Sequence, residues 1–403
     1  MRPSSYPMLD AATAAATVLE RIFVLGPEEV QVAQLRGRVL AADLHSTVRL
    51  PGLPLSAVDG YAHRTADSGG WLRVTGESAA GRPYAQDLGP GQAVTILTGG
   101  VVPAGADAVV MVEDVTSEGD GIRFASTRAG ANINPAGADV EVGELVLAQG
   151  TQLGPAEIAL VAALGRRSLP VHRRPRVALM STGDELLELG CEPGPGQIVD
   201  SNRWALGAAL EETGAEVTML GIAPDEPGAL RALVEGALLE HDVLVTSGGV
   251  SVGSHDLVKP LLAELGQIHV GRVKVRPGKP FTFATLGSDK VAFGLPGFPV
   301  SSLVTFEVFV RPALRRMQGH SRLQRLELPV QLGYDAQASG DRTDFQRVRL
   351  QAQDGVLVAH STGRQASSRL LSMVGAQGLV RIPPGERGLL RGEAVTALLL
   401  SLD

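Results

Sequence analysis

The spacing of apolar residues changes along the chain, and each change predicts a different kind of element. Residues 9–25 follow a helical rhythm that Gly26-Pro27 ends. Residues 29–45 repeat this rhythm with valines and leucines, which predicts a second short helix. Helical spacing returns at 157–164. We therefore expect residues 1–45 and 146–174 to form a helical linking region, which would also be the dimerisation region.

The stretch from 46 to 145 has the pattern of a small all-β domain. Short β-rich runs alternate with turn pairs such as Gly69-Gly70 and Pro90-Gly91. The runs are Trp71–Thr75, Ala93–Leu97, Ala108–Val112, Gly121–Phe124 and Leu145–Val146. Because helical spacing precedes and follows this stretch, the β domain is predicted to be inserted into the linking region.

Residues 175–322 alternate strands with helices, which predicts a three-layer α/β domain with a ligand crevice at the carboxyl ends of its strands. The predicted strands are 176–180, 216–220, 242–246, 268–275, 281–284 and 291–294, and the helices lie near 202–213, 226–240, 256–265 and 300–317. Short strands follow over 323–403 and predict a C-terminal β-barrel-like domain. The fold class is thus a multidomain protein of α/β and β parts.

Composition narrows the class of protein. The formal net charge of −7 argues against a general nucleic-acid binder, and no stretch approaches the ~20 apolar residues of a membrane span. The weakly apolar run Ala11–Leu19 lies between charged residues, which favours an amphipathic helix over a signal sequence. The single cysteine, Cys191, can form no internal disulfide and suits a reducing compartment. We expect a cytoplasmic protein without nucleic-acid or membrane partners.

Polar residues follow three predicted strands of the α/β domain, in the segments 181–185, 223–225 and 246–256. Loops at strand ends converge on one crevice in an open α/β sheet. They would bring together hydroxyls, glycine amides and carboxylates: Ser181, Thr182, Ser247, Ser251, Gly248, Gly249, Asp184, Glu185, Asp225 and Asp256. Taken singly, such residues are equally typical of helix caps and turns. Their convergence favours a binding site.

Basic residues lie downstream of these loops. Arg272, Lys274 and Arg276 alternate with valines, so on a strand they would project from one face, and a rigid turn then presents Lys279. A solvated edge strand is the alternative interpretation. A second rigid turn, 295–300, leads into the last helix of the domain. Basic groups, amides and carboxylates together suit a phosphorylated ligand with a hard cation such as Mg²⁺, rather than zinc.

Several long segments match one family in the family's own order. They read SAVDGYA (56–62), TGGVVPAGADAVVMVED (98–114), GANINPAGADV (130–140), STGDEL (181–186), GQIVDSNRWAL (196–206), SGGVSVGSHDLVK (247–259), KVRPGKPF (274–281) and LPGFPVSS (295–302). The turn around Asp59 and the loop beginning at Thr98 are, as isolated features, more typical of structural turns. Along nearly its whole length the chain resembles the MoeA/gephyrin family of molybdopterin molybdenumtransferases.

The resemblance implies the final step of molybdenum cofactor biosynthesis. Molybdate is inserted into adenylylated molybdopterin, AMP is released, and Mg²⁺ is required. It also implies a homodimer of four-domain subunits, whose cleft lies between the α/β domain of one subunit and the inserted β domain of the other. Transient contacts with other cofactor-biosynthesis proteins and apo-molybdoenzymes are a further expectation.

The resemblance also assigns residues. The catalytic positions are Asp59, Thr98, Glu185, Asp225 and Asp256, and the last three of these are the expected metal ligands. The expected ligand-binding residues are Ser181, Thr182, Ser247, Gly248, Gly249, Ser251, Arg272, Arg276, Lys279, Pro296, Pro299 and Ser368. The chain departs from the usual pattern at Val58, Ser254, Arg276 and Phe298. Phe298 puts the polarity of the proline turn in doubt.

Two other functions stay open. One is adenylyl transfer to molybdopterin, since related α/β domains catalyse that reaction; the fused β domains argue against it. The other is a non-catalytic scaffold, because eukaryotic relatives also cluster receptors. The chain lacks the long linker and the second cofactor-synthesis domain of such scaffolds.

Overall fold

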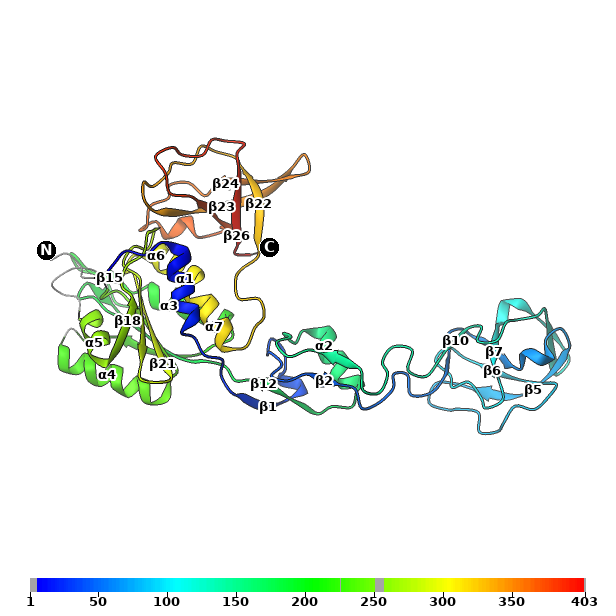
Figure 1. The fold of residues 1–403 in the computed structure, drawn as a ribbon. Coiled ribbons are helices and arrows are strands. Elements are labelled where there is room, and N and C mark those ends of the chain that lie inside the picture. The colour runs from blue at the N-terminus through cyan, green and yellow to red at the C-terminus, as the bar shows by residue number, and fades with distance from the viewer. Residues whose placement is uncertain (1–5, 225, 251–256, 402–403) are drawn as a thin grey trace.

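The computed structural model describes residues 6–224, 226–250 and 257–401. Figure 1 shows an elongated molecule. The α/β domain and the C-terminal β domain lie together at one end, the inserted β domain lies at the other, and a slender linking region joins them. Among the described residues, no helix is long and apolar enough to cross a membrane.

The α/β domain is built on a sheet with the strand order β16-β13-β17-β21-β20-β18. Its strands are β13 (Arg176–Ser181), β16 (Glu216–Ile222), β17 (Val243–Ser247), β18 (Gly266–Val270), β20 (Thr282–Leu286) and β21 (Lys290–Leu295). The pairs β16–β13, β13–β17 and β17–β21 are parallel. The central strands are continuous apolar runs because helices cover both of their faces.

Two hydrophobic cores lie on the two faces of this sheet. One contains side chains of α4 (Pro227–Glu240) and α5 (Val258–Leu265). The other contains α3 (Asn202–Glu212), α6 (Pro299–Thr305) and α7 (Arg311–Met317), with a π-helical turn, η4 (Phe306–Val310), between the last two. The predicted three-layer arrangement is therefore confirmed.

The N-terminal segment differs in part from the prediction. Helix α1 (Ala11–Glu20) forms as expected, and Val18, Ile22 and Leu25 join the core of the α/β domain. The helix predicted over 29–45 is wrong. Residues Pro27–Gln31 are strand β1, which pairs with β12 (Ser168–His172), and a 3₁₀ turn (Val32–Gln34) follows. The apolar spacing there fits buried positions on a strand and a turn, and the strand's partner lies far along the chain.

The linking region has a core of its own. It contains β1 and β12, helix α2 (Pro155–Ala163), and the short pair β2 (Leu44–His45) and β11 (Leu145–Leu147). Beyond it, the inserted domain has a sheet of order β7-β4-β6-β5-β9-β8 and the short pair β10–β3. These strands are β3 (Leu55–Ser56), β4 (Gly60–His63), β5 (Trp71–Ser78), β6 (Gln92–Ile96), β7 (Ala108–Met111), β8 (Val115–Glu118), β9 (Gly121–Phe124) and β10 (Ile133–Asn134).

The C-terminal domain is a closed barrel, as the sequence predicts. Strands β23, β24, β22, β26 and β25 pair in this order, and β25 pairs again with β23. Their bounds are β22 (Glu327–Leu332), β23 (Thr343–Gln353), β24 (Val356–Ser361), β25 (Gly378–Ile382) and β26 (Ala394–Leu399). A short strand of the α/β region, β19 (Val275–Arg276), pairs with β23 and connects the two domains.

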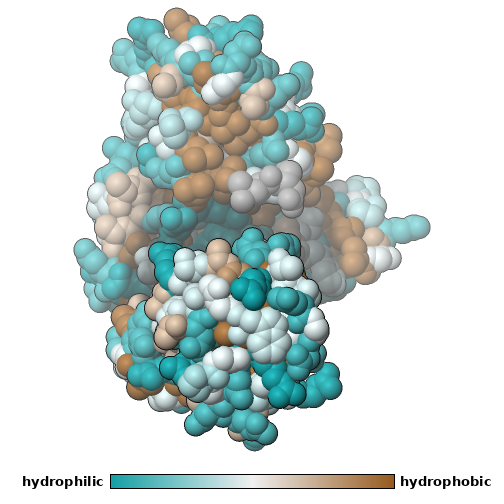
Figure 2. Space-filling view, turned by 90° about the vertical axis from the view of Figure 1, so that its right-hand side faces the viewer, coloured by the Kyte–Doolittle hydropathy of each residue, from teal (hydrophilic) through white to brown (hydrophobic). Residues whose placement is uncertain are grey.

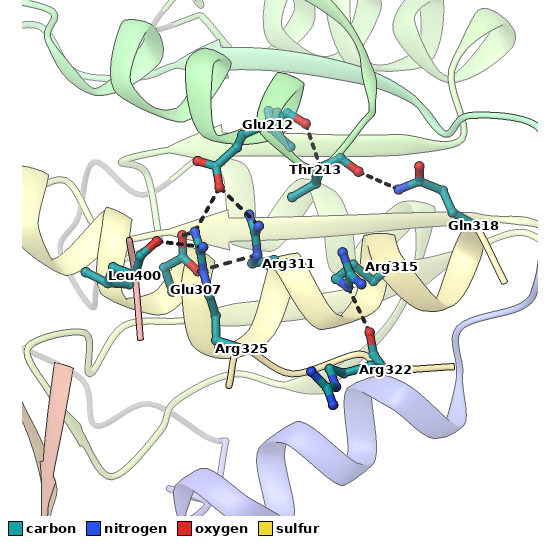
Figure 3. A network of polar contacts seen from close by, with 10 residues as sticks. Glu212, Thr213, Glu307, Arg311, Arg315, Gln318, Arg322, Arg325 and Leu400 are labelled. Carbon is teal, nitrogen blue, oxygen red and sulfur yellow. Dashed lines mark hydrogen bonds and ion pairs between the residues drawn. The ribbon is translucent and has the colours of Figure 1, made fainter. Parts of the chain in front are cut away.

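A network of charged side chains also joins these domains (Figure 3). Arg325, in the segment before β22, donates to both carboxylate oxygens of Glu307 at 2.8 and 3.0 Å. It also donates to Glu212 at 3.1 Å and to the carbonyl oxygen of Leu400 at 2.7 Å. Arg311 donates to the same oxygen of Glu212. The C-terminal barrel is thereby attached to α3 and to the π-helical turn.

Candidate functional site

The loops after β13, β16 and β17 meet at one edge of the sheet. The Thr182 amide donates to the Ser247 carbonyl at 2.9 Å, and the Ala223 amide donates to the Ser181 carbonyl at 2.7 Å. These backbone bonds follow from the parallel pairing of β13 with both neighbours. The loops converge as the sequence predicts, although Asp225, Ser251 and Asp256 lie outside the described residues.

Glycine is required where the loop after β17 turns against the loop after β13. Gly248 and Gly249 have φ angles of 86° and 65°, in the left-handed region. A Cβ atom on Gly248 would lie 2.4 Å from the Thr182 carbonyl oxygen. The Gly248 amide donates to the Leu295 carbonyl at 3.0 Å, so it already has a partner in the structure.

A cavity of about 240 Å³ lies between these loops. Its walls include Thr182, Gly183, Asp184, Glu185, Ala223, Pro224, Leu230, Gly249, Leu257 and Val258. Asp184 and Glu185 are exposed at its rim. The hydroxyls of Ser181 and Thr182 are buried, and within the described part of the chain they find no hydrogen-bond partner. Thr182, Asp184 and Glu185 therefore bring oxygen atoms to the cavity, the donor type that hard cations and phosphorylated ligands use, whereas Ser181 lies behind its wall.

The proline turn (295–300) lies beside the glycine loop, which follows β17 and contains Gly248 and Gly249. The side-chain amide of Asn202 donates to the Ser247 hydroxyl at 2.8 Å and to the Gly297 carbonyl at 2.7 Å. Pro296 and Pro299 frame this turn, and Pro299 is the first residue of α6, where a missing amide hydrogen costs nothing. Sequence reasoning gave no role to Asn202. The only signal was its place at the start of a helix, in a segment that matched the family.

The C-terminal barrel reaches the same turn. The Val300 amide donates to the Ser367 carbonyl at 3.2 Å, so the exposed Ser368 lies next to a residue that contacts the proline turn. The buried guanidinium of Arg347 supports this segment by donating to the Ala366 carbonyl. The segment that contains Ser368 is thus joined to the beginning of α6 through Ser367 and Val300.

The basic segment is only partly as predicted. The charged residues alternate with buried Val273 and Val275, as the pattern predicts. The continuous strand over 268–275 is wrong, because β18 ends at Val270 and the next backbone bonds go to Leu9. Arg272 donates to the Tyr6 carbonyl at 3.0 Å. Arg276 donates to Ser339 of the barrel at 3.4 Å, and Lys279 is exposed.

Asp59 and Thr98 form a second polar group in the inserted domain. One carboxylate oxygen of Asp59 accepts from the Thr98 amide at 2.6 Å and from its hydroxyl at 2.8 Å. These two bonds hold the pKa of Asp59 below its usual value, so the carboxylate is charged at neutral pH. Three exposed apolar residues lie beside the pair: Leu97 precedes Thr98, Met111 pairs with Gly60 across the strands, and the Val112 amide donates to the Asp59 carbonyl.

A single subunit does not bring the two polar groups together. The inserted domain, with β6 and β7, lies at the far end of the molecule from the sheet edge that carries the cavity (Figure 1). Figure 2 views the molecule from that end, with the inserted domain in front of the other parts. Its front surface is mostly hydrophilic or neutral, and the hydrophobic patches of this view lie on the parts behind it. Asp59 and Thr98 are therefore remote from Glu185 within one chain.

The α/β fold with these loops defines a class of molybdopterin-binding proteins. Residues 178–316 match the family model described as a probable molybdopterin binding domain. Residues 9–165 match the MoeA N-terminal region (domains I and II), and residues 329–400 match the MoeA C-terminal region (domain IV). The chain belongs to the MoeA/gephyrin family of molybdopterin molybdenumtransferases.

Its relatives cover nearly the whole chain. A molybdopterin molybdenumtransferase of Nostoc sp. is 38% identical over 93% of this chain and 89% of its own length. A gephyrin of Dictyostelium discoideum is 34% identical over 99% of this chain and 63% of its own length. A crystal structure of the molybdopterin biosynthesis MoeA protein from Pyrococcus horikoshii aligns with a TM-score of 0.84 and 33% identity, covering 98% of this chain and 100% of that one.

Proposed function

We propose that this protein inserts molybdenum from molybdate into adenylylated molybdopterin and releases AMP, the final step of molybdenum cofactor biosynthesis. The observation that carries this proposal is the meeting of the loops after β13, β16 and β17 around one cavity, to which Thr182, Asp184 and Glu185 contribute. Relatives named molybdopterin molybdenumtransferase, matched over nearly the whole chain, support it.

In this proposal the glycine loop and the basic residues bind the phosphates of the substrate. Gly249 lets the backbone approach the ligand, and Lys279 and Arg276 offer positive charge on exposed side chains. Ser181 and Thr182 supply hydroxyls that have no other partner among the described residues. The proline turn and Ser368 close the cleft from the side of the barrel. The mechanism needs no nucleophilic side chain.

Mg²⁺ fits the donors of this cavity. Asp184 and Glu185 present carboxylates there, and the hydroxyl of Thr182 adds an oxygen atom, the donor type that Mg²⁺ prefers. We propose Glu185, Asp225 and Asp256 as its ligands. When bound, the ion polarises the pyrophosphate link between the pterin and AMP.

We further propose that the protein works as a homodimer in which Asp59 and Thr98 of one subunit complete the cleft of the other. The distance between the two polar groups within one chain supports this arrangement. Thr98 keeps Asp59 ionised and fixes its orientation, so it can accept hydrogen bonds from the substrate or orient water at the molybdate. We place the protein in the cytoplasm, where it would meet other cofactor-biosynthesis proteins and apo-molybdoenzymes.

The first experiment measures AMP release from adenylylated molybdopterin with and without molybdate, and with and without Mg²⁺. Release that depends on both is the expected result. Formation of adenylylated molybdopterin from molybdopterin and ATP would instead favour the adenylyltransferase alternative. Binding of a partner protein without molybdate-dependent AMP release would favour the scaffold.

A mixing experiment tests the shared cleft. Asp59→Asn and Glu185→Gln each remove one half of the cleft, so each variant alone should be nearly inactive. Re-associated in equal amounts, half of the dimers are mixed and carry one intact cleft, so roughly a quarter of the wild-type activity should return. Each variant mixed with itself is the control. Wild-type activity of Asp59→Asn alone, or no recovery in mixed dimers, would contradict the proposal.

A further inference from the structure

The segment Asp200–Arg203 lies beside the cleft and has no part in the function proposed above. It leads into α3, which begins at Asn202. Asp200 and Arg203 are only 1% and 4% exposed, whereas Asn202 is half-buried. Charged side chains are rarely buried so completely unless they hold other parts of a structure in place.

Arg203 and Asp200 fix the position of this segment. The guanidinium of Arg203 donates to Glu188 and lies 3.4 Å from a carboxylate oxygen of Asp200. The other oxygen of Asp200 accepts from the Arg203 amide at 3.2 Å, and the Asp200 amide donates to the Leu187 carbonyl at 2.9 Å. The segment is therefore tied to residues 186–188, which directly follow Glu185.

Asn202 extends from this segment to two loops of the cleft. Its amide nitrogen reaches the Ser247 hydroxyl of the glycine loop at 2.8 Å and the Gly297 carbonyl of the proline turn at 2.7 Å. A carbonyl can only accept, so the nitrogen end of the side chain must face Gly297. Both hydrogens of the amide are used. One side chain thus connects the loop after β17 with the loop after β21.

The two loops that Asn202 connects are in close contact. A Cβ atom on Gly297 would lie 3.9 Å from the Cα atom of Gly248. The backbone bond from Gly248 to Leu295 is the other connection at this point. Without the amide of Asn202, the tip of the proline turn would keep its bond from Ser302 to Pro296 but lose its connection to Ser247. The proline turn would then be held less firmly against the glycine loop.

We infer that Asn202 is a positioning residue, which sets the glycine loop against the proline turn so that both contact the phosphates of the same substrate molecule. This inference rests on the proposed function for the identity of the substrate. The side chain acts through Ser247 and Gly297 rather than on the reacting atoms. Its loss should weaken binding of the nucleotide part of the substrate and leave the turnover of bound substrate largely unchanged.

The chain offers a matched control at the other end of the same helix. Gln318 also donates two hydrogen bonds from one side-chain amide, to the carbonyls of Thr213 at 2.9 Å and Leu314 at 3.1 Å. It is 5% exposed. Figure 3 shows it reaching Thr213 just beyond the end of α3. Gln318→Ala therefore removes two bonds, one to the residue that ends α3 and one to Leu314 of α7, without touching the cleft.

The test compares Asn202→Ala, Asn202→Asp and Gln318→Ala in the full-length protein, with thermal unfolding as a check of folding. For Asn202→Ala we expect AMP to bind roughly tenfold more weakly and KM to rise by a similar factor, with kcat within about twofold of wild type. Asn202→Asp should bind AMP more weakly still, because a carboxylate cannot donate and repels phosphate. Gln318→Ala should bind AMP as the wild type does, although its unfolding temperature falls.

Hydrogen exchange of the ligand-free protein tests the positioning itself. Peptides that contain Ser247 or Gly297 should exchange faster in Asn202→Ala and unchanged in Gln318→Ala. Unchanged exchange there, or an equal loss of AMP affinity in both alanine variants, would overturn the role of Asn202. If wild-type protein releases no AMP in the presence of molybdate, the proposed function fails instead, and the exchange experiment still decides whether Asn202 connects the two loops.

Discussion

Helix α3 begins at the cleft and ends in the charged network, and its two ends satisfy their polar groups to different degrees. At its beginning, the hydroxyls of Ser181, Thr182 and Thr246 are buried, and within the described residues they have no partner. At its end, Glu212 accepts from both Arg311 and Arg325, and Thr213 accepts from Gln318 (Figure 3). Only Arg311 Nη1 of that network is buried without a partner in the described part of the chain.

This difference separates polar groups that stabilise the fold around the end of α3 from hydroxyls of β13, β17 and Thr182 that are available to a ligand. A buried polar group without a partner costs free energy, so a protein keeps one where a ligand or ion will provide the missing bond. A network whose members satisfy one another gives rigidity and needs nothing from outside. Helix α3 can therefore lie beside hydroxyls that await a ligand at its beginning, because the charged network holds its end in place.

The largest loss of stability is expected from breaking the charged network at the end of α3. In Arg325→Leu the carboxylate of Glu307, which is 9% exposed, loses both bonds from Arg325. Removing one partner of a buried ion pair costs about 3–5 kcal/mol, and Arg311 Nε, 3.8 Å from Glu307, offsets part of the loss, so the free energy of unfolding should fall by about 3 kcal/mol in urea titrations. Arg387→Ala is the control, since its pair with Glu393 lies on the surface and is worth less than about 1 kcal/mol. Equal losses of unfolding free energy in both variants would show that the charged network does not stabilise the end of α3.

Low pH should lower the stability of the fold through His320, which lies near Arg311 and Arg315 of the charged network. Burial, with the nearby charges of Arg315 and Arg311, lowers the pKa of His320 from 6.5 to about 3. In the unfolded chain the ring takes up a proton below pH 6.5, whereas in the folded protein it stays neutral down to about pH 3. The unfolded state binds the extra proton in this window, so stability should fall as pH falls, by up to about 1.4 kcal/mol per pH unit.

Unfolding titrations between pH 7 and pH 4.5 measure this dependence. In His320→Gln the side chain cannot take up a proton, so the loss of stability across the window should be smaller than in the wild type by about 2–3 kcal/mol. His45→Gln, at an exposed position, should keep the wild-type dependence. The prediction fails if the two variants respond to pH alike.

The sequence predicted features that depend on local pattern, and it did not predict features that depend on contacts between distant residues. Strands such as β9 (Gly121–Phe124) were predicted with their true bounds, because turn residues delimit a short β-rich run. The helix expected over 29–45 failed because β1 pairs with β12, more than a hundred residues later, and local spacing does not reveal such a partner. Convergence of the strand-end loops followed from topology alone. The roles of Asn202 and of the Gly248 amide could not be predicted, since both depend on contacts with the proline turn.

Gln318→Ala and Asn202→Ala should separate stability from binding at the two ends of α3. Loss of a buried amide leaves the carbonyl of Thr213 without its donor, so Gln318→Ala should lower the free energy of unfolding by about 1–3 kcal/mol. Asn202 is half-buried, and water can replace it at Gly297, so its loss should cost about 1 kcal/mol. The order of the two variants in stability should be the reverse of their order in lost AMP affinity. If one variant lost more stability and also more AMP affinity than the other, the two ends of α3 would not differ in role.

The smallest effect on stability should come from Ser181→Ala. Its hydroxyl is fully buried at the end of β13 and makes no hydrogen bond within the described part of the chain, so removing it should change the free energy of unfolding by less than about 0.5 kcal/mol, or raise it slightly. Binding of Mg²⁺ or AMP should nevertheless weaken several-fold if the hydroxyl serves a ligand. Thr305→Val is a useful contrast, because its hydroxyl donates to the Ser301 carbonyl inside α6. That variant should lose stability and keep its affinity for both ligands. A Ser181→Ala variant that is destabilised and binds normally would show that the Ser181 hydroxyl stabilises the fold and does not serve a ligand.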